Sequence, residues 1–235
     1  MIAIAAAVPA QANTRTFGLT SFDRIEIYGD MVVEIIPDNR ITAVANASRA
    51  SLETLSMEVS NRILTVRQVS EGVYGPRTTA ADGPISIRIT AQNLSAIVVR
   101  GSAQVTAAGL RGREILITTD GAARVTATIP SSEAVLLRST GSGEITVSGR
   151  TQRLRATTNG AGAIDASALA ARDLDVQVVG TGNSSFAASA TATILAQGAA
   201  GATVTGRPRC EVRNTGAGTT SCGAAARGSA APRGQ

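Results

Sequence analysis

The 235-residue sequence contains no histidine, no lysine and no tryptophan, and aromatic residues make up only 2% of it. Without histidine the chain lacks the commonest general base and the commonest transition-metal ligand, which excludes a Ser–His nucleophile and a histidine-based metal centre. The scarcity of aromatic rings leaves little to stack on bases or sugar rings. With a hydrophobic content of 43%, the core must be built from Ala, Val, Ile and Leu.

All 22 cationic side chains are arginine, and the formal net charge is +5. Residues 1–206 hold 17 Arg against 16 acidic residues, whereas residues 207–235 hold 5 Arg against Glu211 alone. The body of the protein is therefore nearly neutral and the C-terminal end is basic. Proteins that bind nucleic acids usually combine a basic face with aromatic side chains, so we expect no nucleic-acid partner.

The N-terminus, MIAIAAAVPAQANT, is apolar and rich in alanine. It leads to Ala10-Gln11-Ala12, a small-x-small pattern of the kind that signal peptidase cuts, so residues 1–12 are interpreted as a signal peptide, truncated because a positive n-region is missing. The predicted location is periplasmic, outer-membrane-associated or secreted. The alternative is a disordered apolar N-terminus on a cytosolic protein. No stretch is long and apolar enough to predict a transmembrane span.

Glycines recur along the chain at steps of 18 to 20 residues, at Gly101, Gly121, Gly141, Gly160, Gly180 and Gly198. Three further columns keep the same steps, including a shared one-residue deletion. The first column contains Ile115, Val135, Leu154, Leu174 and Ile194. The second contains Ile117, Leu137, Ala156, Val176 and Ala196. The third contains Val105, Val125, Ile145, Ile164, Ser184 and Val204. A shared register across several columns indicates an internal structural repeat.

Each repeat holds two short segments with period-2 alternation, joined by a glycine-rich turn, as in EAVLLRSTGSGEITVSG. Alternation of this kind is typical of half-buried strands, and units of about 20 residues bury their apolar faces by stacking. We therefore predict an all-β fold, a single-stranded parallel β-helix (a β-solenoid) with coils of about 20 residues, right-handed by the usual chirality of parallel crossovers. The glycines would form the corners, because the chain must turn sharply there and glycine reaches positive φ without a Cβ clash. A phosphate-binding loop is not expected, because such a loop needs a helix behind it and here a strand follows.

The segments before the repeats are less regular. FDRIEIYGDMVVEIIPD predicts a strand, a turn at Gly29-Asp30 and a second strand. Strands are then expected near residues 42–46, 57–59 and 63–66, with a tight turn at Asn61-Arg62 and a helical turn in RASLETL. Residues 69–84 predict a long loop, and residues 223–235 a disordered tail. The β-helical domain is thus expected to span residues 17–222.

Several segments resemble the head GIN domain, which is found in putative auto-transporter adhesins and related exported bacterial proteins. They are the opening FDRIEIYGDMVVEIIPDN, the following LSMEVSNRILTVR and the later series GSAQV, GSGEITVSG, GAGAIDASAL and GTGNSSFAAS, which together cover roughly residues 17–205. The resemblance implies a β-helical fold, a cell-envelope or secreted location and an adhesin-like label. It supplies no catalytic residues.

The residues that could carry enzymatic chemistry are scattered. Acidic side chains occur at Glu114, Asp120, Glu133, Glu144, Asp165, Asp173 and Asp175, and only the last two share a strand face, where exposure to solvent explains them. The nucleophile pattern G-x-S-x-G is absent. We therefore expect no enzyme activity, no catalytic residue, no bound metal and no cofactor.

Two functions are weighed. The first is a non-catalytic, exported envelope protein with an adhesin-like or structural role, and the alternative is a β-helix that binds or cleaves polysaccharide. The expected partner is an envelope protein, a polysaccharide or a second copy of the chain. Tyr74 and Arg77 in the long loop form a candidate contact surface. Three convergent carboxylates or an Arg–Asp pair in a groove would favour polysaccharide, and flat faces rich in Ser, Thr and Ala would favour the first function.

The two cysteines, Cys210 and Cys222, lie in RPRCEVRNTGAGTTSCG, a final strand–turn–strand unit. A step of 18 residues from Val204 reaches Cys222, and Cys210 has the parity of Val212, so both are predicted to face inward. We predict a disulfide between them that closes the last coil. Two buried free thiols and a metal pair are the alternatives.

Overall fold

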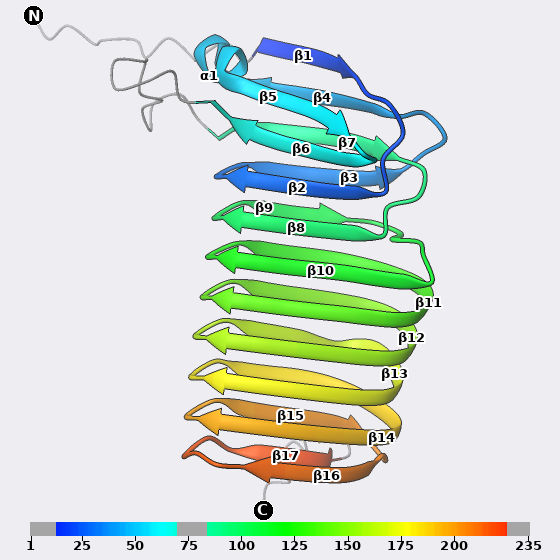
Figure 1. Cartoon of the computed structure of the whole chain (residues 1–235), viewed down its shortest axis with the longest axis vertical. Coiled ribbons are helices and arrows are strands. Elements are labelled where there is room, and N and C mark those ends of the chain that lie inside the picture. Colours follow the sequence, from blue (N-terminus) through cyan, green and yellow to red (C-terminus); the bar gives the residue numbers. More distant parts are fainter. Residues whose placement is uncertain (1–12, 70–83, 225–235) are drawn as a thin grey trace, which may run out of the picture.

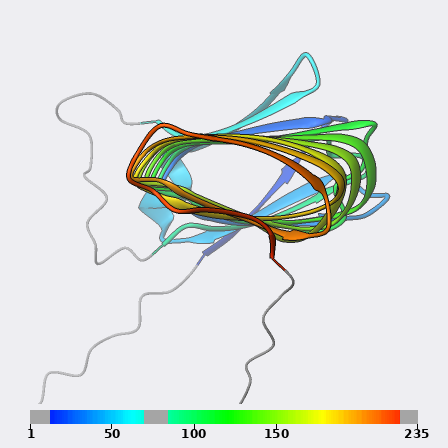
Figure 2. The same cartoon turned by 90° about the horizontal axis from the view of Figure 1, so that it is seen from below.

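The computed structural model describes residues 13–69 and 84–224. In this part of the chain, parallel strands stack one above another into a β-solenoid (Figure 1). Seen along its axis, the solenoid is a flattened oval with two facing walls (Figure 2). The fold class predicted from the repeats is confirmed.

The regular coils occupy the C-terminal two-thirds of the solenoid. Each of the long strands in them rounds one corner, so that one strand contributes to both walls: β14, for example, pairs with β15 through its first half and with β16 through its second half. These coils comprise β8 (Ala96–Gly101), β9 (Gln104–Ala107), β10 (Glu114–Gly121), β11 (Arg124–Gly141), β12 (Glu144–Gly160), β13 (Ala163–Gly180), β14 (Asn183–Gly198), β15 (Gly201–Gly206), β16 (Arg209–Asn214) and β17 (Thr220–Ala224).

The apolar columns face the interior, as the repeat predicts. Ile117, Leu137 and Val176 stand in one column and are at most 1% exposed. The predicted register is wrong in the last coils. Leu174 pairs with Ala192, and Ser184 pairs with Ala202, two residues before the partners that the sequence steps suggested. The reason is the 18-residue step from Gly180 to Gly198, which is two residues shorter than the usual step and shifts the register by two. Because side chains alternate with a period of two, the same residues still face inward.

The N-terminal coils do not stack in the order of the sequence. β2 (Arg24–Gly29) and β3 (Val32–Pro37) form one coil that lies between two later ones. β2 pairs with both β6 (Ile63–Gln68) and β8, and β3 pairs with both β7 (Ser86–Ala91) and β9. After β1 (Asn13–Gly18), which lies at the N-terminal end, the chain therefore enters the stack with β2 and β3, returns to build the N-terminal end and then continues the solenoid from β8.

Antiparallel strands and a short helix close the N-terminal end. β1 pairs with β4 (Thr42–Ala47), and β5 (Leu55–Ser60) pairs with β6. The helix α1 (Arg49–Thr54) starts at Ser48, whose Oγ accepts a hydrogen bond from the Ser51 N–H as an N-cap. Leu52 of this helix and Leu55, which follows it, are buried. The expected helical turn and strand pair are confirmed, and Asn61 and Arg62 form the tight turn with positive φ.

A disulfide joins Cys210 of β16 to Cys222 of β17, with 6.3 Å between their Cα atoms. Cys210 lies in register with Ala192 and Cys222 with Val204, both of which are buried core positions. The bond links the two walls at the last coil. This coil has no further coil beneath it among the described residues, so the covalent link holds together an end that packing stabilises on one side only.

Replacing both cysteines by serine (Cys210→Ser with Cys222→Ser) is expected to lower the free energy of unfolding by about 2–3 kcal/mol, because the closed loop is short. Urea unfolding followed by circular dichroism measures the difference. Wild-type protein with its disulfide reduced should unfold at the midpoint of the double variant. Equal midpoints for the oxidised wild type and the double variant would contradict a stabilising role.

Candidate functional site

The two predicted contact residues, Tyr74 and Arg77, lie outside the described residues, as do residues 1–12 and 225–235. Within residues 13–69 and 84–224, no group of three or more His, Cys, Asp or Glu side chains could hold a metal ion. No helix in this part of the chain is long and apolar enough to cross a membrane. Grooves on the outer surface are the remaining candidates for a site.

A shallow groove of about 580 Å³ runs across the outer face of one wall, over β10 to β14. Its outward side chains form two columns along the solenoid axis. The first comprises Glu114, Ala134, Arg153, Asp173 and Thr191, and the second comprises Leu136, Arg155, Asp175 and Thr193. Parallel in-register stacking places residues from successive coils about 4.8 Å apart, so the two arginines lie directly beside the two aspartates.

Two of the charged groups in this wall groove form an ion pair, and a third accepts a hydrogen bond. The Arg155 Nε lies 3.4 Å from Asp175 Oδ2, and the Thr191 hydroxyl donates a 2.6 Å hydrogen bond to Asp173 Oδ1. The Arg155 and Asp175 side chains remain 70% and 55% exposed. A pair so exposed contributes little to stability. The groove thus offers alternating hydrogen-bond donors and acceptors to a ligand.

Sequence reasoning identified Asp173 and Asp175 but overlooked their partners, Arg153 and Arg155. The repeat itself contains the pattern that identifies these arginines. Each arginine precedes its aspartate by 20 residues, which is the coil step that the apolar columns follow. Applying the repeat to outward positions, as was done for inward ones, would have predicted the two pairs.

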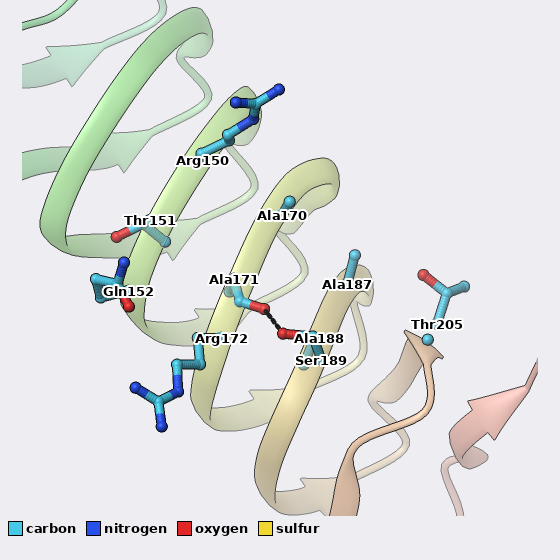
Figure 3. A pocket seen from close by; sticks show the side chains of 11 residues that line it. Arg150, Thr151, Gln152, Ala170, Ala171, Arg172, Ala187, Ala188, Ser189 and Thr205 are labelled. Atoms are coloured by element: carbon cyan, nitrogen blue, oxygen red, sulfur yellow. Dashed lines mark hydrogen bonds between the residues drawn. The ribbon is translucent and has the colours of Figure 1, made fainter.

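A second, smaller pocket of about 370 Å³ lies at the rounded corner of the last coils (Figure 3). It lies where β14 rounds the corner with two fewer residues than β13, so the wall steps inward there. Ala170, Ala187 and Thr205 stack along it, and the Ser189 hydroxyl is bonded to the Ala171 carbonyl oxygen at 3.2 Å. Arg150 and Arg172 point to opposite sides. The corner pocket therefore offers few converging groups, and the wall groove is the better candidate.

Tyr28 lies on the outer face of β2, beside Glu26 and Arg100. Its hydroxyl donates a 2.9 Å hydrogen bond to Glu26 Oε2, and the Arg100 guanidinium sits 5.1 Å from the ring centroid. The hydrogen bond to Glu26 raises the pKa of the Tyr28 phenol, because ionisation would lose the donor and place a second anion beside the carboxylate. Tyr28 is thus held as a neutral phenol.

Ion pairs also link neighbouring coils elsewhere on the surface. Arg113 donates through Nε and Nη2 to both carboxylate oxygens of Glu133, at 3.1 and 3.0 Å, and this lowers the pKa of Glu133. Arg124 and Glu144 form a similar pair at 2.9 Å on the opposite wall from the groove. Opposite charges on adjacent coils favour the correct register, since a slipped coil would separate each pair.

The repeat, the two-walled solenoid and the glycine corners agree with one family. Residues 21–208 match the model of a family described as "putative auto-transporter adhesin, head GIN domain". The chain belongs to this family. The resemblance seen in the sequence is confirmed. No curated protein shows a significant match to the sequence.

Solved structures support the fold of this GIN-domain protein. A putative adhesin from Parabacteroides distasonis is similar with a TM-score of 0.71 and 16% identity, over 91% of this chain and 98% of that one. A putative adhesin from Bacteroides fragilis has a TM-score of 0.69 and 18% identity, over 90% and 97%. A putative lipid binding protein from P. distasonis has a TM-score of 0.67 and 14% identity, over 91% and 97%. At these identities the likeness concerns the fold alone.

Proposed function

We propose that this GIN-domain protein is an exported, non-catalytic protein of the cell envelope with an adhesin-like role. The observation that carries the proposal is the wall groove, in which Asp175 forms an ion pair with Arg155 and Asp173 accepts a hydrogen bond from Thr191. General acid–base catalysis requires an acid or base that is available to the reacting atom at a suitable pKa, and both aspartates of this groove are already engaged. A surface of paired donors and acceptors suits binding instead.

Export is supported by the signal-like residues 1–12, by the adhesin description of the family and by the disulfide. Disulfides persist in oxidising compartments and are rare in the cytosol. Mass spectrometry of the protein from the envelope fraction of its native host should find a mature N-terminus at Asn13. Recovery of the intact Met1 form from the cytosol would contradict export.

A second candidate is polysaccharide binding at the wall groove, favoured by the Arg155–Asp175 pair. Guanidinium and carboxylate groups side by side can donate to one sugar hydroxyl and accept from the next. Arg153 and Asp173 lie in register two residues earlier on the same two strands, β12 and β13, and this repetition suits a polymer with repeating hydroxyls. The candidate is binding and not cleavage, because the described residues hold no group of three or more acidic side chains that could bind a catalytic cation.

A glycan panel probed with the purified protein tests this second candidate. Arg155→Ala is expected to weaken the binding of any captured polysaccharide by roughly tenfold, because a hydrogen bond to a charged group is lost. Arg124→Ala is the matched control, since it removes a similar surface ion pair outside the groove. Equal losses in the two variants, or binding to no glycan, would exclude the wall groove as a polysaccharide site.

A further inference from the structure

The C-terminal end of the solenoid has two strand edges with no partner in the described part of the chain. β16 pairs only with β14, and β17 pairs only with β15. Every residue of β16 is exposed, including Val212, which is 43% exposed although it continues the buried Ile194 column. An edge of this kind invites pairing with another strand.

The orientation of the backbone groups on β16 follows from its ladder. The Thr215 N–H donates to the Ala196 carbonyl at 2.9 Å, so odd-numbered residues here face β14. In a parallel ladder, the N–H and C=O groups of one residue point to the same neighbouring strand, and the next residue points away. The N–H and C=O groups of Cys210, Val212 and Asn214 therefore face outward from the end of the solenoid.

The opposite end is built differently. There α1 packs against β1 and β4, and the Arg15 guanidinium is bonded to the Leu52 carbonyl oxygen at 3.0 Å. The core residues at that end are covered, as the burial of Leu52 and Leu55 shows. A head-to-tail stack would have to place an open parallel edge against this closed end. In the described part of the chain, the parallel strands of the solenoid end in free edges at the C-terminal end alone, whereas the edges at the closed end belong to the antiparallel strands β1 and β5.

We propose that two copies of the chain associate through their C-terminal ends, with β16 pairing antiparallel to β16 of the second copy about a two-fold axis at Val212. This register uses the free backbone groups of Val212 as a hydrogen-bonded pair. It also places Glu211 opposite Arg213 of the second copy, twice by symmetry. The other residues with outward backbone groups give less favourable registers. Centring on Cys210 would place Glu211 opposite Arg209 but Arg213 opposite Arg207, and centring on Asn214 would place Arg213 opposite Thr215. Among the registers that the backbone allows, charge thus favours the one centred on Val212.

The other wall is compatible with the same axis. The disulfide sets Cys210 beside Cys222, and the two walls run in opposite directions, so Thr220 of β17 lies across from Val212. The Ala202 N–H donates to the Thr219 carbonyl, which leaves the groups of Thr220 facing outward. The Thr220 Oγ1 is buried without a hydrogen-bond partner among the described residues. A second Thr220 across the axis would supply that partner, as in cross-strand threonine pairs.

Analytical ultracentrifugation of the full chain over about a hundredfold range of concentration tests the proposal, with a concentration-dependent dimer as the expected result. Val212→Pro removes an N–H that faces only the second copy, so it should abolish the dimer and leave thermal unfolding of the monomer nearly unchanged. Glu211→Pro is the matched control, because it breaks the ladder to β14 and should destabilise the monomer. A wild-type chain that stays monomeric, or a Val212→Pro variant that still forms dimers, would overturn the proposal.

Charge exchange tests the register without disturbing the fold, since Glu211 and Arg213 are both exposed. Glu211→Arg alone and Arg213→Glu alone should each weaken the dimer by roughly tenfold or more, through like-charge pairs. Mixing the two variants should restore association as a one-to-one heterodimer, because each then complements the other. Restoration supports the Val212 register, and failure of the mixture to associate rejects it.

Ala224, the last described residue, lies at this same end. Deleting residues 225–235 therefore tests whether the edge is occupied by a second copy or by the tail of the same chain. Deleting residues 225–235 should leave dimer formation and its dependence on Val212 unchanged. A dimer that appears only after the deletion would show that the tail, and not a second copy, occupies the edge in the full chain. That result would overturn the proposal.

Discussion

Replacing Ile145 by aspartate is expected to destabilise the protein more than any other single change considered for this chain. Ile145 is 0% exposed and lies between Val125 and Ile164 in one inward column. The substitution removes apolar packing on both sides and buries a carboxyl group with no cation nearby. The expected loss is on the order of 5 kcal/mol of unfolding free energy, measured by urea or thermal unfolding.

The pH dependence of the Ile145→Asp variant gives a second test. Burial raises the pKa of the introduced carboxyl group, so its neutral form fits the core better than its charged form. The stability deficit should therefore shrink as the pH falls below that raised pKa and grow as the pH rises through it. Thr126→Asp, at an exposed outward position in the neighbouring coil, is the control and should change stability by less than about 1 kcal/mol. An unchanged melting midpoint for Ile145→Asp would place residue 145 outside the core.

Gly121→Ala is expected to cost about 3–4 kcal/mol, for two separate reasons. The residue has a φ of +113°, a conformation that strains any side chain. A Cβ atom at this position would also lie 2.6 Å from the carbonyl oxygen of Gly101 in the coil above. Because that oxygen belongs to the backbone of a stacked coil, it cannot move aside without distorting the solenoid.

Gly29→Ala separates the two contributions. Gly29 has nearly the same φ, +111°, but a Cβ there would meet nothing closer than the Met31 Cε at 3.9 Å. This variant should lose only the conformational part, about 1–2 kcal/mol. Thermal and urea unfolding of both variants gives the comparison. Equal losses would mean that the close approach of coils at the glycine corner contributes nothing.

The fold of the regular coils could be predicted from the sequence because the same pattern of alternating apolar residues recurs in every coil. Alternation along each strand assigns Val135 and Leu137 to the inside, and the coil step then assigns their counterparts in every neighbouring coil. A register error of two residues, as at Ala192, does not change which face is buried, because the strand period is two.

The wall groove was only half predicted. Asp173 and Asp175 were assigned to a solvent-exposed face, which is correct, but their pairing with arginines on the coil above follows only when the repeat is applied to outward positions as well. The corner pocket could not be predicted, because it arises from a difference in corner length between β13 and β14 that no single repeat contains. The candidate contact residues Tyr74 and Arg77 lie outside the described residues, so that prediction stays open.

The sequence by itself determined the all-β solenoid, its inward columns and its glycine corners, since each of these depends on local periodicity that stacking repeats. Only the tertiary structure decided the order in which the N-terminal strands stack. β2 and β3 lie between coils formed later in the chain, and β4, β5 and β1 close the end as antiparallel strands. Strands with the same alternation pair equally well with several neighbours, so the choice depends on packing and end closure across the whole solenoid.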